Sequence, residues 1–428
     1  MQKSKSFDAN RLYKLQRYDE VIKLYENVER DYIFNEWDYY YYLNALKKME
    51  RYREGLKLSF EVLKRNPQYK RVQDIYCWFI YYEYIRNFHY QNGNEGDFFK
   101  AVDFIVKFAE NNEYTPYRYS LWKAVDYLES KASINYEKIN YYISLLSPNI
   151  LSAEPKKLMK DNKEMKLASE REKWYSIKSK ALLKNGQYEE CIRISQEALR
   201  TFKELHHDNN IWFNYRIAVS KIELGDLDRA EEILVNLLKE KEQWFLYESM
   251  FKIYIKKNDF DKALKFAASA ALSFGEHKHK LKLYEEISDF ISQKGMEKEA
   301  YYHLLLIKKV REENDWKISN EFLAKLYKYN EEELNKTSLI RYLEAFWRQY
   351  KFKGETKLKG VINKILPNGK AGFIQGENGQ RYYFRMNSIC NRKMSVEEGK
   401  EVTFYTKESF DRVKHRVSME AIEIVICK

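Results

Sequence analysis

The sequence has few cysteines, prolines and glycines for its length. It contains 4 cysteines, 5 prolines and 14 glycines in 428 residues. Cys77, Cys191, Cys390 and Cys427 are far apart and form no CxxC pair, which argues against a zinc ribbon and against a disulfide framework. We therefore expect a reducing, cytoplasmic location.

Long apolar runs are also absent. No stretch approaches the roughly 18 uninterrupted apolar residues that a membrane helix needs. The opening residues, "MQKSKSFDANRLYKLQRYDE", lack the apolar core of a signal peptide. The sequence therefore predicts neither membrane insertion nor secretion.

Recognisable catalytic motifs are missing as well. There is no GxxxxGK[ST], no GxSxG and no pair of carboxylates on a recognisable scaffold. His206, His207 and Asp208 form one group of possible metal ligands, and His277 with His279 forms another. Neither group has the i, i+4 spacing of a helical zinc site, so we expect no metal, no cofactor and no catalytic centre.

One short pattern keeps an enzymatic alternative open. The spacing of Arg200 and His206 resembles the Arg–His motif of HEPN-type ribonucleases, and the resemblance is limited to these two residues. A chain with 76 lysines and arginines is expected to contain such a spacing by chance.

What the sequence does contain is apolar, aromatic and basic residues. Apolar residues make up 44% of the chain and aromatic residues 16%, which excludes a mostly disordered protein. The formal charge of +12, from 76 basic against 64 acidic residues, favours a polyanionic partner. The length exceeds what one core usually serves, so several domains or a repeat solenoid are expected.

Most of the chain shows helical periodicity interrupted by short breaks such as "KNGQ", "LGDL", "KKND" and "QKGM". Each break precedes a predicted helix that opens with an aromatic or bulky residue and has a small or apolar residue three positions later. The opening residues are Tyr18, Tyr52, Tyr188, Leu227, Phe260 and Glu297. The first two are 34 residues apart, and the last four are separated by 39, 33 and 37.

These intervals resemble the period of tetratricopeptide repeats. The small residues at the fourth position would let the two helices of a hairpin cross closely; they are Gly55, Cys191, Ala230, Ala263 and Ala300. We predict irregular repeats over 8–150, a charged break or linker helix over 151–172, and regular repeats over 173–353. The last predicted helix, "TSLIRYLEAFWRQYKF", would cap the stack.

The periodicity changes to two near Gly354, and five short predicted strands follow over 355–428. This favours a small barrel of the OB type. The segments "KGVINKI", "NGKAGFI", "RYYFRMNSI" and "SVEEGKEVTF" resemble, in order, the motifs of the cold-shock domain. The fold class we predict is therefore mainly α, an α-solenoid of tetratricopeptide-like hairpins followed by an all-β barrel.

Alternation along "RYYFRM" places Tyr382 and Phe384 inside the predicted barrel, and Tyr383 and Arg385 outside it. Phe373, on the neighbouring predicted strand, joins the outer face. Exposed aromatic rings stack on unpaired bases, and surrounding cations hold the phosphates. The complete predicted nucleic-acid site is Phe373, Tyr383, Arg385, Lys364, Lys370, Met386, Arg381, Arg392 and Lys393.

The barrel departs from the cold-shock pattern at positions that matter for stacking. Lys364 stands where that family has an exposed tryptophan, Ala371 replaces an aromatic residue, and Arg385 with Met386 replaces His-Phe. We expect a non-enzymatic adaptor that binds single-stranded RNA or DNA by its barrel and a protein partner by its repeats. Two alternatives stay open: an RNA-cleaving enzyme using Arg200 and His206, and a peptide-responsive regulator whose barrel only contacts protein.

Overall fold

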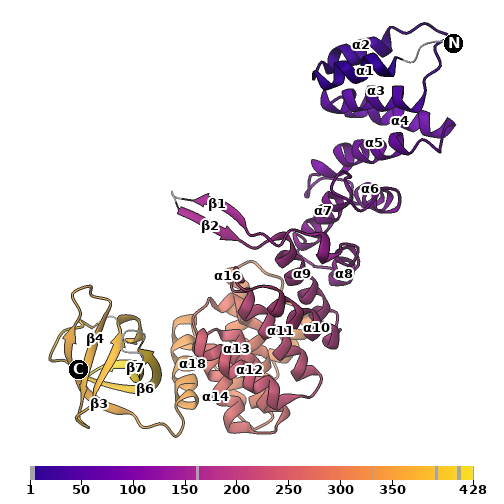
Figure 1. Ribbon diagram of the computed structural model, residues 1–428. Helices are drawn as coiled ribbons and strands as arrows, with labels where there is room; N and C mark the ends of the chain where they lie inside the picture. The colour runs from indigo at the N-terminus through magenta and orange to yellow at the C-terminus, as the bar shows by residue number, and fades with distance from the viewer. Residues whose placement is uncertain (1–4, 161–162, 330, 391–393, 412–415, 428) are drawn as a thin grey trace. The chain divides into compact units, whose positions relative to one another are not determined.

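A computed structural model describes residues 5–160, 163–329, 331–390, 394–411 and 416–427 of the chain. The chain divides into two compact units, residues 1–233 and 234–428. The first is helical apart from one hairpin, and the second holds further helices and a barrel (Figure 1). The chain is thus a helical repeat solenoid followed by a closed β-barrel, as the change in periodicity predicts.

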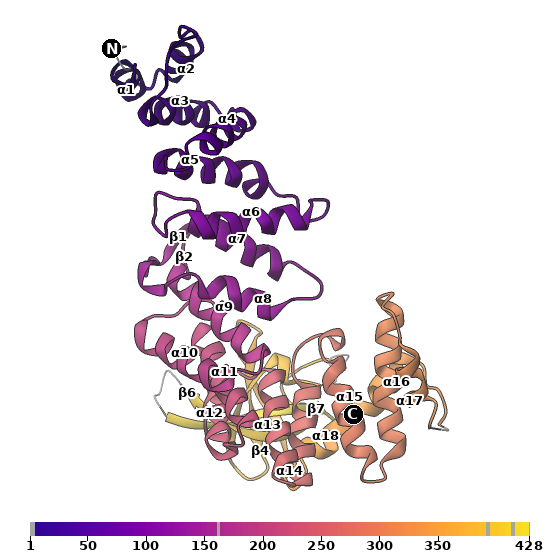
Figure 2. The same cartoon turned by 90° about the vertical axis from the view of Figure 1, so that its right-hand side faces the viewer.

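Consecutive helices of the first unit lie against one another in sequence order (Figure 2). α5 continues as a π-helical segment, Tyr81–Arg86. The division between the units falls within α12, Leu227–Glu240. The other helices of the first unit are α1 Ser6–Lys14, α2 Tyr18–Glu26, α3 Glu36–Lys48, α4 Tyr52–Arg65, α5 Lys70–Ile80, α6 Glu95–Phe108, α7 Tyr117–Glu129, α8 Tyr136–Ser144, α9 Glu170–Lys184, α10 Tyr188–Thr201 and α11 Asn209–Glu223.

The six positions predicted to open helices are each the first residue of one, which confirms the repeat phase. A residue with positive φ lies two positions before each of these helices. In three turns it is Gly186, Gly225 or Gly295. In the other three it is Gln16, Glu50 or Asn258, with φ between 56° and 57°. This left-handed residue ends the preceding helix and turns the chain back.

The small residues of the repeat phase lie where two helices cross. A Cβ atom added to Gly55 in α4 would come within 2.1 Å of the buried Phe79 ring in α5. The Sγ of Cys191 in α10 approaches the carbonyl oxygen of Ser179 in α9 at 3.3 Å. The predicted reason for small side chains at this phase is confirmed, since larger ones would hold the helices apart.

The charged break or linker helix predicted over 151–172 is not what the structure shows. This segment forms a two-stranded hairpin of β1, Lys156–Lys160, and β2, Lys163–Leu167. It does not separate two sub-arrays, because Trp174 Nε1 in α9 donates a 2.9 Å hydrogen bond to the carbonyl of Ile143 in α8. A single core cluster spans both sides of the insertion, so the hairpin loops out of a continuous stack.

In the second unit, α18 is the predicted final helix, and its Trp347 ring stacks on Tyr284 of α15 with centroids 5.6 Å apart. No helix in the described residues is both long and apolar enough to cross a membrane. The helices that follow α12 are α13 Trp244–Lys256, α14 Phe260–Leu272, α15 Leu281–Ser292, α16 Glu297–Glu313, α17 Asn320–Leu326 and α18 Lys336–Lys351.

The five predicted strands close into a barrel with the order β3-β4-β5-β7-β6. All neighbours are antiparallel except β5 and β7. Gly372 is required in β4, because a Cβ atom there would lie 2.6 Å from the Phe384 ring inside the barrel. The strands are β3 Leu358–Ile365, β4 Ala371–Gly376, β5 Arg381–Arg385, β6 Glu401–Asp411 and β7 Arg416–Ile426.

The barrel rests on the helices of its own unit through charged and aromatic contacts. Glu423 of β7 accepts from Arg348 Nε at 3.1 Å and from Lys351 Nζ at 3.4 Å. Burial alone would raise the pKa of Glu423, but these two cations and a hydrogen bond from Cys390 Sγ hold it below its usual value. The rings of Phe352 and Tyr405 stack with centroids 4.0 Å apart. These contacts use the side of the barrel formed by β6 and β7.

Candidate nucleic-acid interface

One cross-strand row runs around the outside of the barrel and takes one residue from each strand. The register pairs Lys364 with Phe373, Phe373 with Tyr383, Tyr383 with Glu420, and Glu420 with Lys407. Directly opposed residues in a sheet share one face, so the row presents a cation, two aromatic rings, a carboxylate and a second cation.

The predicted inside and outside residues of β4 and β5 are confirmed. Tyr382, Phe384 and Ile374 are buried in the barrel core, whereas Phe373 and Tyr383 are partly exposed on its surface. The two surface rings have centroids 5.8 Å apart and planes 69° apart. Two adjacent aromatic rings on an outer barrel face are suited to contact successive bases of an unpaired strand.

Arg381 covers one of these rings. Its guanidinium carbon lies 4.1 Å from the centroid of Phe373. An exposed cation–π contact contributes about 0.5–1 kcal/mol, whereas stacking of a base contributes about 1–3 kcal/mol. A base stacked on Phe373 would therefore outcompete the guanidinium, which would leave Arg381 available to a phosphate.

Arg385 is exposed as predicted, but its charge already has a partner. Its Nε lies 3.1 Å from Oε1 of Glu420, whose side chain is nearly buried. Sequence reasoning missed Glu420 as part of the site. The alternation of "RVSMEAIEI" places Glu420 on an outer face, but only the parallel pairing of β5 with β7 brings it beside Tyr383.

The remaining predicted residues differ in position. Lys364 and Lys370 are exposed, Lys364 beside Phe373 and Lys370 in the turn before β4. Met386 is half-buried and packs against the barrel core, so it contributes less surface than predicted. Arg392 and Lys393 lie outside the described residues.

Contacts with the helices leave the aromatic face uncovered. In the parts of unit 2 that the structure describes, β4 and β5 make no ion pair or ring contact with a helix. Lys407, at the far end of the cross-strand row, forms an ion pair with Glu242 at 2.5 Å. The row thus has one end at the helices and the other, at Lys364, toward solvent.

Of the group His206-His207-Asp208, His206 is held by a buried carboxylate. The backbone amide of His206 donates to Glu172 Oε1 at 2.7 Å, and its Nδ1 lies 2.9 Å from Oε2 of the same buried carboxylate. Asn209 Nδ2 donates to this carboxylate as well, at 2.8 Å. Arg200 is exposed on α10. Within the described ranges, no three His, Cys, Asp or Glu side chains are grouped as metal ligands.

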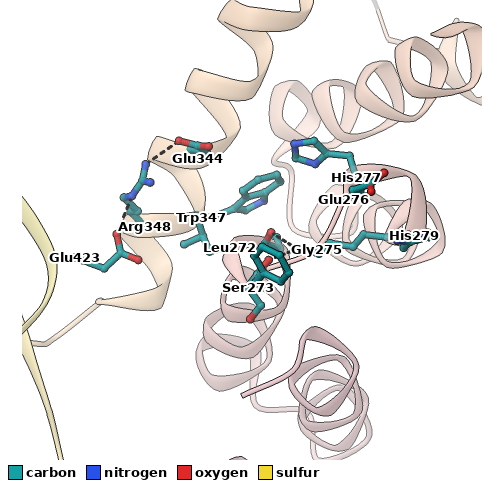
Figure 3. A pocket seen from close by; sticks show the side chains of 13 residues that line it. Leu272, Ser273, Gly275, Glu276, His277, His279, Glu344, Trp347, Arg348 and Glu423 are labelled. Atoms are coloured by element: carbon teal, nitrogen blue, oxygen red, sulfur yellow. Dashed lines mark hydrogen bonds and ion pairs between the residues drawn. The ribbon is translucent and has the colours of Figure 1, made fainter. Parts of the chain in front are cut away.

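A cavity of about 570 Å³ lies beside α18, at the end of α14 and the loop that contains His277 and His279 (Figure 3). Buried Lys280 donates to two backbone carbonyls at the end of α14, and burial lowers the pKa of Lys280 to about 8. Arg348 bridges Glu344 and Glu423, each at 3.1 Å. These charges are satisfied by the cavity wall, so we assign no ligand to it.

The first unit carries a surface cluster of aromatic rings. Tyr52 stacks on Tyr82 with centroids 4.4 Å apart, and Tyr82 stacks on Trp78 at 5.7 Å. Exposed Tyr119 approaches Trp78 at 6.0 Å, and Lys47 lies 5.4 Å from the same indole. The rings come from successive repeats, so this cluster joins the repeats as well as forming surface.

Comparison with known proteins identifies little beyond the fold. A family model described as a domain of unknown function (DUF7017) matches residues 211–345. No curated protein matches the chain.

Three solved structures are similar to the chain, and one of them is described as a tetratricopeptide repeat protein. A tetratricopeptide repeat protein from Parabacteroides merdae is 12% identical, with a TM-score of 0.31 over 76% of this chain and 95% of that one. The human IFIT1 dimer with PPP-AAAA is 13% identical, with a TM-score of 0.36 over 80% and 79%. Yeast Tom70 is 14% identical, with a TM-score of 0.25 over 82% and 96%. Likeness at this level carries no information about function.

Proposed function

We propose that this protein is a non-catalytic cytoplasmic adaptor. Its cold-shock-like barrel binds single-stranded RNA or DNA, and its helical array binds a protein partner. The observation that carries the first role is the pair of outward rings, Phe373 and Tyr383, on adjacent strands of a closed barrel. In OB-type barrels the face of the second and third strands binds oligonucleotides, and in this barrel those strands are β4 and β5.

Charge around the rings supports a phosphate-bearing ligand. Lys364, Lys370 and Arg381 are exposed beside or near them, and none has a carboxylate partner within 4.0 Å in the described residues. Two stacking contacts contribute about 2–6 kcal/mol in total, which is weak binding by itself. The cations therefore supply much of the affinity, and binding depends strongly on salt.

The protein-binding role rests on the helical array. Stacked helical repeats present extended surfaces that take up segments of other proteins. Exposed aromatic residues such as Trp37 and Tyr119 on α3 and α7 support this role, because aromatic side chains are enriched at interfaces. The non-catalytic assignment is supported by His206, whose ring and backbone are engaged with Glu172.

The deciding experiment measures oligonucleotide binding by fluorescence anisotropy. Phe373→Ala with Tyr383→Ala should weaken binding of a short single strand by a similar factor at every salt concentration. The control removes two exposed aromatic residues elsewhere, Tyr114→Ala and Phe274→Ala, and should leave affinity unchanged. No loss in the barrel variant would reject the stacking role. Strand cleavage by the wild-type protein that Arg200→Ala abolishes would instead establish the nuclease alternative.

A further inference from the structure

The hairpin of β1 and β2 is a two-stranded ribbon that extends away from the helices of the first unit (Figure 1). Its register pairs Lys157 with Lys166 and Leu158 with Met165. In the described residues neither strand pairs with a third. Leu158, Met159 and Met165 are 49%, 69% and 41% exposed, so neither face of the ribbon is covered.

Isolated two-stranded hairpins are at best marginally stable in water, and exposed apolar side chains add to their free energy in solution. A ribbon with this composition gains stability by binding a partner. The positive charge of the segment favours a negatively charged partner. Residues 156–167 contain five lysines and two acidic residues, a net charge of +3.

The types of residue narrow the partner further. The stretch 152–169 has no aromatic residue, although aromatic residues form 16% of the chain. It therefore offers no platform for unpaired bases. All its basic residues are lysines, which act as point charges toward phosphates, whereas arginine is the usual reader of guanine edges. This composition fits the backbone of a duplex, contacted without regard to sequence.

We propose that the hairpin is a second nucleic-acid contact and binds double-stranded DNA. The major groove of B-form DNA admits a two-stranded ribbon, whereas that of an A-form helix is narrow. The register places Lys157 and Lys166 opposite one another on one face of the ribbon and Lys156 on the other face, so the three lysines would reach phosphates on both sides of the groove. Leu158, Met159 and Met165, all exposed, supply apolar contact within the groove.

Two lysines already have acidic neighbours. Lys157 lies 3.1 Å from Glu164, and Lys166 lies 3.3 Å from Glu204. All four side chains are about half exposed or more, and ion pairs between such side chains are weak. A phosphate therefore replaces either carboxylate readily.

The base of the hairpin makes a clean deletion possible. Arg171 donates from its backbone amide to the carbonyl of Ser152 at 3.0 Å and from Nε to the carbonyl of Leu151 at 3.1 Å. These bonds close the insertion below its strands. Among the residues that the structure describes, replacing 154–168 by Gly-Ser-Gly removes one surface ion pair to the rest of the unit, that of Lys166 with Glu204 in the loop after α10.

The experiment uses the full chain and two labelled probes, a DNA duplex and a single strand of the same length. Lys156, Lys157 and Lys166 are changed together to Gln; a matched variant changes Lys57, Lys64 and Lys100, which are exposed on α4 and α6. The hairpin variant should bind duplex about tenfold or more weakly at low salt. The slope of log affinity against log salt should flatten by about 0.9 for each lost phosphate contact. Single-strand binding and the matched variant should be unchanged.

The proposal does not depend on the barrel, and the results separate the two. Phe373→Ala with Tyr383→Ala should affect the single strand and spare the duplex, whereas deletion of 154–168 should do the reverse. Unchanged duplex binding after the deletion would overturn the proposal. It would also be overturned if the Gln variant lost binding to phosphatidylserine vesicles or to a co-purified protein while keeping its affinity for duplex.

Discussion

The indole Nε1 of Trp347 donates a 2.9 Å hydrogen bond to Nε2 of the fully buried His303. The other ring nitrogen, Nδ1, lies 2.7 Å from the carbonyl oxygen of Glu299. Nε2 must present a lone pair to the indole, so the imidazole is neutral with its proton on Nδ1. Burial lowers the pKa of His303 to about 4. This bond joins the capping helix α18 to α16.

The second unit should lose stability as the pH falls from about 6.5 to about 4. In that range the unfolded chain binds a proton at His303 that the folded protein does not, so the free energy of unfolding decreases with falling pH. The shift corresponds to about 3 kcal/mol from this residue. Urea unfolding followed by tryptophan fluorescence at several pH values measures it. His303→Gln, which does not titrate, should flatten the dependence; an identical dependence in both proteins would contradict this account.

Lys364→Trp should strengthen binding of a single strand to the barrel. Lys364 is exposed and pairs in register with Phe373, so the new ring would extend the aromatic row by one platform. One added stacked base contributes about 1–3 kcal/mol, or roughly 5- to 150-fold in affinity. The lost cation should flatten the salt slope by about 0.7 at the same time. Anisotropy titrations over a range of salt test both effects, and weaker binding at high salt would count against the row as a stacking surface.

Glu420→Gln should raise affinity for nucleic acid and steepen its dependence on salt. The carboxylate of Glu420 neutralises Arg385 at 3.1 Å, beside Tyr383. Replacing it by a neutral amide of the same shape releases the guanidinium for a phosphate, which adds about 0.7 to the magnitude of the slope for a single strand. Glu377→Gln, an exposed carboxylate in the turn after β4, is the matched control. Equal gains in the two variants would indicate a general effect of net charge.

Gly55→Ala should destabilise the first unit even though alanine favours helix over glycine by about 1 kcal/mol. The added Cβ atom would overlap the Phe79 ring, which is fully buried. Overpacking of this kind costs about 1–3 kcal/mol. Thermal unfolding of Gly55→Ala, Phe79→Leu and the double variant measures the coupling. The double variant should be more stable than additivity predicts, and strict additivity would rule out the overlap.

The sequence predicted those parts of the fold in which the polarity of each side chain indicates whether it is buried or exposed. Alternation in "RYYFRM" identified the buried Tyr382 and the outward Tyr383, because a strand with one face in a core alternates in polarity. The hairpin over 156–167 was missed because both of its faces are exposed, so its side chains show no such contrast. The pairing of Arg385 with Glu420 was missed because it depends on which distant strand lies beside β5.

The turns within the helical hairpins have a consequence for how such chains diverge. Gln16, Glu50 and Asn258 adopt the same left-handed backbone as Gly186 in the equivalent turn. A residue other than glycine in this conformation costs about 1 kcal/mol, which packing of the two helices offsets. The geometry of each turn is therefore imposed by the helices on either side of it. Evolution can therefore replace these glycines one at a time while the helical stack keeps its shape. Related repeat proteins then retain the same backbone after their sequence similarity is lost.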